Sequence, residues 1–385
     1  MSNKRQYAKG INPDLLKWCR ENVHFSVEDA ASYVGVTSER ILQWESGEEL
    51  PTIKQAMKLG KKYHKPWAVF FLPERPNFQV LQDFRSVLAE EKSKWTSRLS
   101  IFLNETREQQ EWLRDYYRFS SGEENDYIGS WTDLDNPMGL AHIIVEAVKI
   151  NYEEVSGFGR RQNVFKYYQE LVEENTDIFV GKTTAEKIEV SEMRGVYLHD
   201  EYAPMVFVNS TDALSAQIFT LFHELAHAFL GQGGVSSIEP LHNTTSGDEA
   251  IEVFCNKVAS EIVLPTSQLQ AIFRESGGRA LDIVRNISIQ FKVSEELIAI
   301  KLNQLGDLSI EDLREIKRLT RIAVSNRPSS SFGNYHLNRY SRNGHLFTKT
   351  VLSAYKSGEI MSLDAAKLLN IKTAHIGKQM EYAFS

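Results

Sequence analysis

Residues 218–231 read IFTLFHELAHAFLG, an apolar stretch interrupted by His223, Glu224 and His227. On an α-helix, residues four apart lie on one face, with Cβ atoms roughly 5–6 Å apart. Two imidazoles at this spacing can bind one metal ion through ring nitrogens about 2.0–2.1 Å away. Glu224 follows the first histidine by about 100° of helical turn, so its carboxylate lies beside the metal. The pattern predicts a zinc site in which His223 and His227 are ligands and Glu224 is the catalytic base.

The residues around this motif favour a buried helix. Ser210, Thr211 and Asp212 can cap its start, and Gly231 and Gly233 can end it. Between these ends, apolar residues form a broad stripe with the histidines near it: Leu214, Ile218, Leu221, Phe222, Leu225, Phe229 and Leu230. Buried polar side chains need a partner, and a metal ion would be one. The alternative is a core helix whose polar groups are only hydrogen-bonded.

A catalytic zinc takes three protein ligands and keeps one position for water. The downstream candidates for the third ligand are Glu239, His242, Asp248, Glu249, Glu252 and Glu261. Residues 248–264 predict a second helix, on which Glu252, Asn256 and Ala259 share one face. Glu252 can therefore point at the metal, with Asn256 supporting a ligand. Glu249 lies on nearly the same face, so helical geometry prefers Glu252 only weakly.

Two segments before the motif predict a small β-sheet. Residues 176–183 and 195–209 alternate in polarity, with a turn at Asp200 and Glu201. An extended peptide can add to the edge of such a sheet by main-chain hydrogen bonds. Peptide hydrolysis also needs a group that stabilises the oxyanion. The candidates are Tyr197, His199, Tyr202 and His242, and the sequence does not choose among them.

Residues 12–72 predict a series of short helices. Ser26 with Asp29 three residues later forms a capping-box pattern, and a GVTS turn begins at Gly35. Two short helices joined by a glycine-containing turn indicate a helix-turn-helix. Residues 1–75 hold 12 of the 44 Lys and Arg and 9 of the 51 Asp and Glu, a net charge of +3, against −10 for the rest of the chain. Any nucleic-acid contact is therefore expected at this end.

Composition is that of a soluble globular protein, with 42% hydrophobic and 25% charged residues. Its 385 residues are enough for two or three domains. The two cysteines, Cys19 and Cys255, are far apart and form no CxxC pair, which favours a reducing compartment. The first residues lack a signal-peptide h-region, and no apolar run is long enough for a membrane span. We expect a cytoplasmic protein without membrane contact.

The stretch VEDAASYVGVTSERILQWESGEELPTIKQAMKLGKKY (27–63) resembles the DNA-binding domain of the XRE/Cro class of phage repressors. The class hallmark matches Gly35-Val36-Thr37, Trp44-Glu45, Gly47 and Pro51. The resemblance implies that the third helix enters the DNA major groove, and the matching positions are Thr37, Ser38, Glu39, Arg40 and Gln43. Gln43 can address adenine, and Arg40 can address guanine or phosphate. The alternative is a fold retained for partner binding or dimerisation.

Residues 175–266 resemble the ImmA/IrrE family of zinc metallopeptidases. The matching strings are DIFVGKT (177–183), RGVYLHDEYAPMVFVNSTDALSAQIFTLFHELAHAFLG (194–231) and EVFCNKVASEIVLP (252–265). The resemblance assigns the third zinc ligand to Glu252, and the departures at Cys255 and Val258 touch no ligand. QDFRSVL (82–88) and REQQEWL (107–113) are similar to family members that carry an N-terminal XRE domain. Such proteins are bacterial or phage regulators; some cleave or displace a repressor, and some belong to toxin–antitoxin or mobile-element loci.

The sequence thus predicts a predominantly helical α+β protein with four parts. These are an XRE/Cro-like helix-turn-helix domain (1–75), a helical bridge (76–135), a zincin-like metallopeptidase domain with a small β-sheet (136–324), and a linker with a small helical C-terminal domain (325–385). Within the last part, residues 362–380 again look like a helix-turn-helix. A structural or oligomerisation role is the default there, and a second DNA contact is the alternative.

The predicted function is zinc-dependent endopeptidase activity (cofactor Zn2+) coupled to DNA binding. The expected partners are DNA, through the N-terminal domain, and a protein substrate such as a repressor or the product of a neighbouring gene. A homodimer is compatible with these features. The alternative from another class is a non-proteolytic transcription regulator or antitoxin-like binding protein, in which the metal senses or stabilises. An intact Glu224 argues against a purely structural zinc site, because such a site does not need a base.

Overall fold

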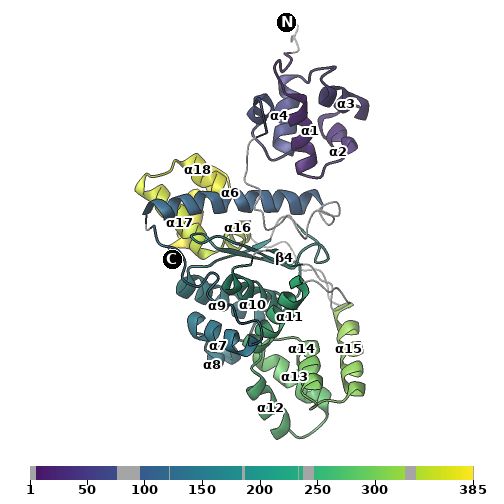
Figure 1. The fold of residues 1–385 in the computed structure, drawn as a ribbon, viewed down its shortest axis with the longest axis vertical. Helices are drawn as coiled ribbons and strands as arrows, with labels where there is room; N and C mark the ends of the chain where they lie inside the picture. The colour runs from purple at the N-terminus through teal and green to yellow at the C-terminus, as the bar shows by residue number, and fades with distance from the viewer. Residues whose placement is uncertain are drawn as a thin grey trace. The chain divides into compact units, whose positions relative to one another are not determined.

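The structure is a computed structural model that describes residues 6–75, 96–120, 122–183, 187–232, 234–236, 247–325 and 335–384. It is predominantly helical with one small β-sheet, as the sequence predicts (Figure 1). The chain divides into two compact units, residues 1–107 and 108–385. The division falls within helix α6 (Ser97–Ser120), which contributes residues to both.

The first unit contains the short helices that the sequence predicts. They are α1 (Pro13–Asn22), α2 (Val27–Val34), α3 (Ser38–Ser46), α4 (Ile53–Lys62) and the 3-10 helix η1 (Trp67–Phe71). The capping box at α2 is confirmed, because Ser26 and Asp29 exchange hydrogen bonds. Thr37 occupies the N-cap position of α3 but makes no side-chain cap hydrogen bond. Gly35, at the end of α2, has a φ of 75° and turns the chain into α3.

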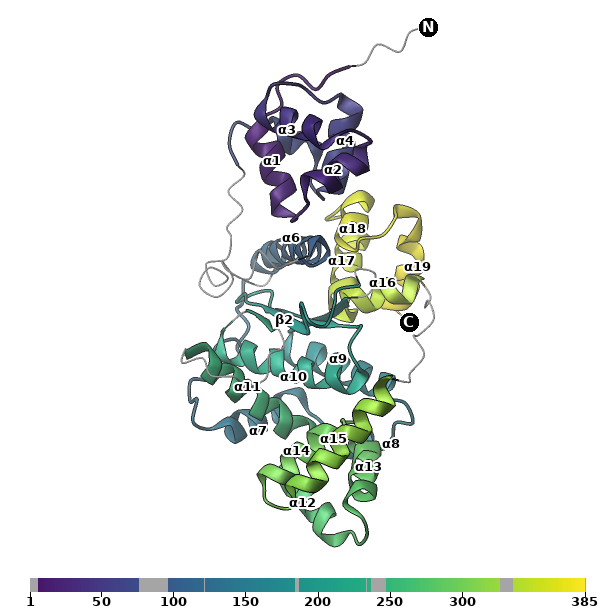
Figure 2. The same ribbon diagram turned by 90° about the vertical axis from the view of Figure 1, so that its right-hand side faces the viewer.

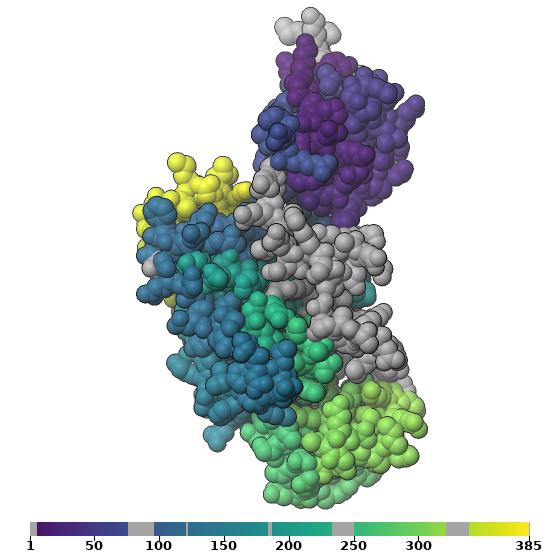
Figure 3. All heavy atoms as spheres, in the orientation of Figure 1, coloured from purple at the N-terminus to yellow at the C-terminus, as the bar shows by residue number. Residues whose placement is uncertain are grey.

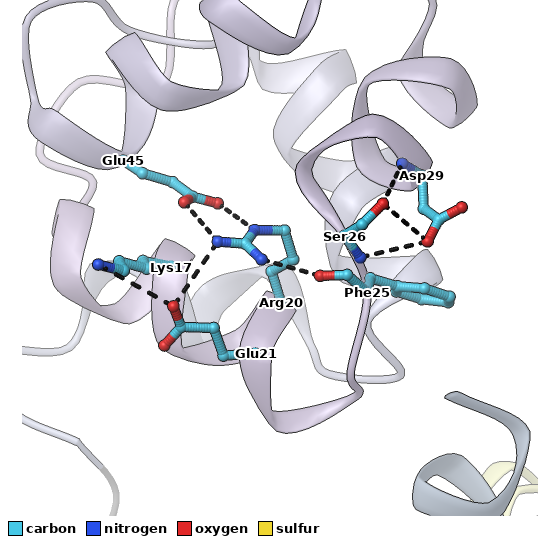
Figure 4. A network of polar contacts seen from close by, with 7 residues as sticks. All are labelled: Lys17, Arg20, Glu21, Phe25, Ser26, Asp29 and Glu45. Carbon is cyan, nitrogen blue, oxygen red and sulfur yellow. Dashed lines mark hydrogen bonds and ion pairs between the residues drawn. The ribbon is translucent and has the colours of Figure 1, made fainter. Parts of the chain in front are cut away.

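A buried ion pair joins α1 to α3 (Figure 4). The guanidinium of Arg20 donates two hydrogen bonds to the Glu45 carboxylate, from Nε at 2.7 Å and from Nη2 at 2.9 Å. Its Nη1 donates to the Phe25 carbonyl at 2.8 Å, which ties the loop before α2 to the same group. Loss of one partner from such a pair typically costs about 3–5 kcal/mol. Glu45 therefore fixes the buried face of α3 to α1. The opposite face of α3 stays exposed.

The second unit is built around a four-stranded sheet. Its elements are the rest of α6, then α7 (Pro137–Val148), α8 (Tyr152–Gly157), α9 (Arg161–Thr176), β1 (Phe179–Thr183), β2 (Gly195–Leu198), β3 (Met205–Asn209), α10 (Leu214–Leu230), β4 (Gly234–Ser236), α11 (Gly247–Val263), α12 (Thr266–Glu275), α13 (Ala280–Phe291), α14 (Glu295–Gln304), α15 (Ile310–Ser325), α16 (Tyr335–Asn343), α17 (His345–Ser357), α18 (Ser362–Leu368), η4 (Thr373–His375) and α19 (Ile376–Ala383). The strand order is β1-β3-β2-β4; β1 is parallel to β3, and the other pairs are antiparallel.

Helices cover both faces of this sheet. In both ribbon views α9 and α10 lie on one face, with α7 and α11 beyond them (Figures 1 and 2). On the other face, Gln110 of α6 donates hydrogen bonds to the carbonyls of Leu198 and Ala203, around the β2–β3 connection. Helices α12–α15 pack against one another and form the lower end of this unit in the space-filling view (Figure 3). The motif helix α10 is thus held between a sheet and a second helical layer.

The prediction for the start of the motif helix is wrong. Ser210, Thr211 and Asp212 do not cap α10; the helix begins at Leu214, and its N-cap residue is Ala213, which has no side-chain cap. The side chains of Thr211 and Asp212 serve the turn after β3 instead, because Thr211 donates to Asn209 and Asp212 accepts from the Ala213 N–H. The C-terminal prediction is confirmed at Gly231, whose φ is 68°. The second predicted end residue, Gly233, lies outside the described residues, as do most of the predicted linker (326–334) and the 82–88 string.

The outer edge of β1 is closed by side chains of α9. Val180 donates its N–H to Glu173 at 3.1 Å, and its carbonyl accepts from Gln169 at 2.6 Å. The same Glu173 carboxylate also accepts from the first backbone N–H groups of α17, those of His345 and Leu346. Burial raises the pKa of Glu173 to about 8, although these three N–H groups favour its charged form. One carboxyl group thus fixes the C-terminal helices to the sheet.

Of the residues at this junction, Gly344 should tolerate an added side chain least. Its φ is 78°, and an added Cβ would lie 2.3 Å from the Val180 carbonyl oxygen and 2.6 Å from Glu173. Gly344→Ala should therefore add overpacking of about 1–3 kcal/mol to the cost of a backbone conformation, φ 78° with ψ 166°, that is essentially restricted to glycine. The comparison variant is Gly358→Ala, in the left-handed region at φ 82° with nothing within 4 Å, which should cost only about 1–2 kcal/mol for its backbone. Denaturant unfolding and hydrogen exchange of α16–α19 measure the loss of stability in each variant. An equal loss in Gly344→Ala and Gly358→Ala would contradict the prediction.

Candidate metal centre

The predicted ligands come from two adjacent helices. Helix α10 packs against strands β2 and β3 on one side and against α11 on another. His223 and His227 are on the buried face of α10, with 5% and 8% of their surfaces exposed. Glu252 comes from α11, and 46% of its side chain is exposed. The three side chains therefore meet where the buried face of one helix faces the partly exposed face of the next.

The three donor groups form a compact triangle. Nε2 of His223 lies 3.1 Å from Nε2 of His227. The Glu252 carboxylate lies 3.1 Å from His223 Nε2 and 3.3 Å from His227 Nε2. In a tetrahedral zinc site with ligand bonds of about 2.0–2.1 Å, the donor atoms are about 3.3 Å apart. The observed spacing fits such a site, and within the described residues no other cluster of His, Cys, Asp and Glu does.

The other third-ligand candidates are not brought to this position. Glu261 accepts hydrogen bonds from Thr266 and from Lys301, on the far part of α11. Glu239 and His242 lie outside the described residues. Asp248 and Glu249 begin α11, where the structure describes the backbone but not the side chains. Glu252 is therefore the candidate that the described structure joins to the histidines.

The charges at this site are coupled. Burial alone would lower the pKa of His223, but the hydrogen bond to Glu252 and the charges of Glu224 and Glu252 outweigh it and raise that pKa. Burial would raise the pKa of Glu252, but its hydrogen bonds to the two imidazoles lower it below the usual range. The Glu252 carboxylate is thus negative and faces two ring nitrogens. These three groups together can bind a cation. Metal binding there would release the protons that otherwise balance the charge.

Glu224 lies between the two histidines in sequence and is completely buried. Strand β2 passes directly over it: a Cβ on Gly195 would be 2.6 Å from Oε1 of Glu224 and 2.9 Å from its Cγ. Only glycine permits this approach of strand to helix. The carboxylate is therefore held against the start of β2, next to the ring that bears the first ligand nitrogen.

Asn256, one turn after Glu252, contacts the ring of His223 and contributes to its raised pKa. This is the supporting position that the helical periodicity predicts. Cys255 is fully buried, and burial raises the pKa of its thiol, so it is a neutral core side chain. Two imidazoles and the Glu252 carboxylate thus form the candidate metal position, and Asn256 supports the ring of His223.

The four oxyanion candidates lie in different places. Tyr197 is on β2, the strand that covers Glu224, His199 directly follows that strand, and the Tyr197 hydroxyl lies 3.3 Å from Nδ1 of His199. Tyr202 is in the β2–β3 connection, where its hydroxyl donates to Glu124 at 3.1 Å. His242 lies outside the described residues.

Two residues near α10 were missed by the sequence analysis. Gly195 opens an otherwise apolar strand, and a glycine inside a strand pattern is the signal of close backbone approach. Lys182 on β1 donates to Gln217 of α10 at 2.9 Å, and burial lowers its pKa to about 7. No sequence signal marks Lys182, because its burial depends on packing of α9 and α10 against β1.

The predicted DNA-contacting residues all lie on α3 or at its start. Thr37 and Arg40 are exposed, and Ser38 and Gln43 are partly exposed. Nε of Arg40 lies 3.1 Å from the Glu49 carboxylate, and both side chains are about half exposed. Leu42 and Glu39 are also exposed on this helix. The face is therefore accessible but carries only one basic residue.

Two protein-family models match segments of the chain. Residues 176–303 match the model of the IrrE N-terminal-like domain, peptidase M78, and residues 16–70 match a helix-turn-helix model. Neither a curated protein nor a solved structure matches the chain. Among the described residues, no helix is long and apolar enough to cross a membrane. The chain therefore carries an IrrE N-terminal-like peptidase M78 domain, which contains His223, His227 and Glu252, together with an N-terminal helix-turn-helix domain of the XRE type.

Proposed function

We propose that this protein is a zinc-dependent endopeptidase that regulates transcription by cleaving a protein partner, such as a repressor or the product of a neighbouring gene. The observation that carries the proposal is the triangle of His223, His227 and Glu252, with Glu224 buried beside it in a peptidase M78 domain. A zinc ion held by these three residues would act as a Lewis acid and make water ionise near neutral pH.

The chain's own residues supply the proton transfers. Glu224 takes a proton from the attacking water and delivers it to the nitrogen of the leaving amine. Its burial under β2 holds the carboxylate in one place, so little reorganisation is needed during the reaction. Tyr197, on β2, and His199, directly after it, are the candidates for hydrogen bonding to the oxyanion.

The sheet offers one edge to an extended substrate. The β1 edge is closed, because Glu173 and Gln169 already bind the outward N–H and carbonyl of Val180. At the other edge, β4 pairs with β2, and no described strand pairs with its outer side. A peptide added there would lie beside the strand that covers Glu224, within the layer that borders the metal centre. We therefore assign substrate binding to β4.

The metal ligands can be tested by elemental analysis. The purified protein should hold about one zinc per chain, and Glu252→Ala should lose most of it, because two imidazoles alone leave the site with two ligands. Asn256→Ala should weaken zinc binding about 10- to 100-fold by loosening His223. Lys257→Ala, an exposed change on the same helix, is the matched control and should keep the metal. Full zinc content in Glu252→Ala would show that another residue is the third ligand.

The role of Glu224 can be separated from metal binding. Glu224→Gln keeps the size of the side chain and should retain zinc, but it removes the base and should slow cleavage at least about 10²-fold. Cleavage is followed by mass spectrometry of the candidate repressor after incubation with each protein. A Glu224→Gln protein that still regulates a reporter gene at full strength would favour the non-proteolytic regulator, in which the metal senses or stabilises.

DNA binding by the first unit is proposed to use Thr37, Ser38, Arg40 and Gln43. Gln43→Ala and Arg40→Ala should each reduce discrimination between operator and unrelated DNA by about 1–3 kcal/mol, because they remove base contacts. Lys61→Ala is the control: it lies on α4, is exposed, and should at most weaken binding to all sequences equally. Mobility shifts at two salt concentrations, with the protein's own upstream region as probe, measure these effects. Unchanged discrimination in both variants would remove α3 as the reading helix.

A further inference from the structure

The last helices of the chain repeat the pattern of the N-terminal helix-turn-helix. Residue 361 corresponds to residue 26, and α18 with η4 and α19 corresponds to α2 with α3. Both begin with the same hydrogen bond, in which the N–H of the N-cap residue donates to the aspartate three positions later. The distance is 3.2 Å from Ser26 to Asp29 and 3.2 Å from Met361 to Asp364.

The buried positions also coincide. In the first unit, the side chains that fix the two helices are Ala30, Ala31, Val34, Ile41 and Trp44. At the equivalent places the C-terminal segment buries Ala365, Ala366, Leu369, Ile376 and Gln379. Both segments thus bury an Ala-Ala pair at the first two of these places.

The turn between the helices has the same backbone conformation. Gly35 has a φ of 75°, and its counterpart Asn370 has a φ of 52°. Asparagine is the residue other than glycine that most readily adopts this left-handed conformation. In each unit the preceding helix completes a three-helix arrangement: α1 packs against α3, and α17 packs against α19 (Figure 2). The C-terminal segment is therefore a helix-turn-helix in structure as well as in sequence.

The surface of this second helix-turn-helix is more basic than that of the first. The residues equivalent to Thr37, Ser38, Arg40 and Gln43 are Lys372, Thr373, His375 and Lys378. Lys372, Thr373 and Lys378 are exposed. Residues 335–385 hold seven Lys and Arg and three Asp and Glu, a net charge of +4, whereas residues 76–334 carry −14. Of these two lysines, Lys378 pairs with the Glu381 carboxylate.

We propose that the C-terminal helix-turn-helix, residues 361–383, is a second DNA-binding module. Its reading helix is η4 with α19, and Lys372 and Lys378 bind the phosphates or guanines of a duplex. The ligand is double-stranded DNA, because the basic residues occupy the positions at which this fold faces the major groove. This inference rests on the C-terminal segment alone and does not depend on the proposed peptidase activity.

The experiment is fluorescence anisotropy of the full chain with a labelled duplex of mixed sequence at a series of KCl concentrations. Each lost phosphate contact reduces the slope of log affinity against log salt by about 0.9, so Lys372→Ala with Lys378→Ala should reduce it by about 1.8. At low salt the affinity should fall roughly tenfold. The slope of log affinity against log salt depends on the number of phosphate contacts. Loss of the two lysine contacts is therefore measurable even while the N-terminal module still binds DNA.

The matched control is Lys166→Ala with Lys317→Ala. Both lysines are on helix surfaces of the second unit and pair with a carboxylate, at 3.3 and 3.5 Å. This variant should keep the slope of the unchanged protein. Thermal unfolding and zinc content of all variants establish that they are folded. A slope in Lys372→Ala with Lys378→Ala equal to that of the control would overturn the proposal and leave the module as a protein-binding or dimerisation surface.

Discussion

The structure of the second unit depends on one constraint: helix α10 buries two imidazoles and a carboxylate within an apolar core. Burial without partners would cost several kcal/mol for each charge, so the surrounding elements are arranged around these groups. Helix α11 brings Glu252 within 3.3 Å of both rings, and β2 approaches closely enough that Gly195 has no room for a side chain. The candidate metal site is therefore part of the core, and the same contacts set its packing and its geometry.

Much of this arrangement could be predicted from local patterns. Some features depend only on residues within one or two helical turns of each other, so they can be predicted from the sequence. They are the capping box at Ser26, the turn at Gly35 and the helix that carries His223, Glu224 and His227. The choice between Glu252 and Glu249 could not be made from periodicity, because it depends on how α10 and α11 cross. Strand β4 has three residues and exists only by pairing with β2, so no alternation marks it. The start of α10 was placed too early, because side chains typical of a helix cap instead serve the turn after β3.

Charge separates the chain into three zones. The two terminal segments, 1–75 and 335–385, carry net charges of +3 and +4, and the residues between them carry −14. Positive charge at the two ends favours contact with nucleic acid there, and negative charge disfavours it in the middle. Two DNA-binding modules on one chain would also raise the effective concentration of each at a site bound by the other.

The closed β1 edge has a consequence for how copies of this chain behave at high concentration. Linear growth of strand-to-strand aggregates needs two open edges, one to receive the next molecule and one to offer to it. Here Gln169 and Glu173 occupy the outward groups of β1, and the start of α17 is fixed to the same carboxylate. If two molecules paired through their β4 edges, no open sheet edge would remain for a third molecule. The sheet can thus accept one extended strand at β4 without becoming the seed of a fibre.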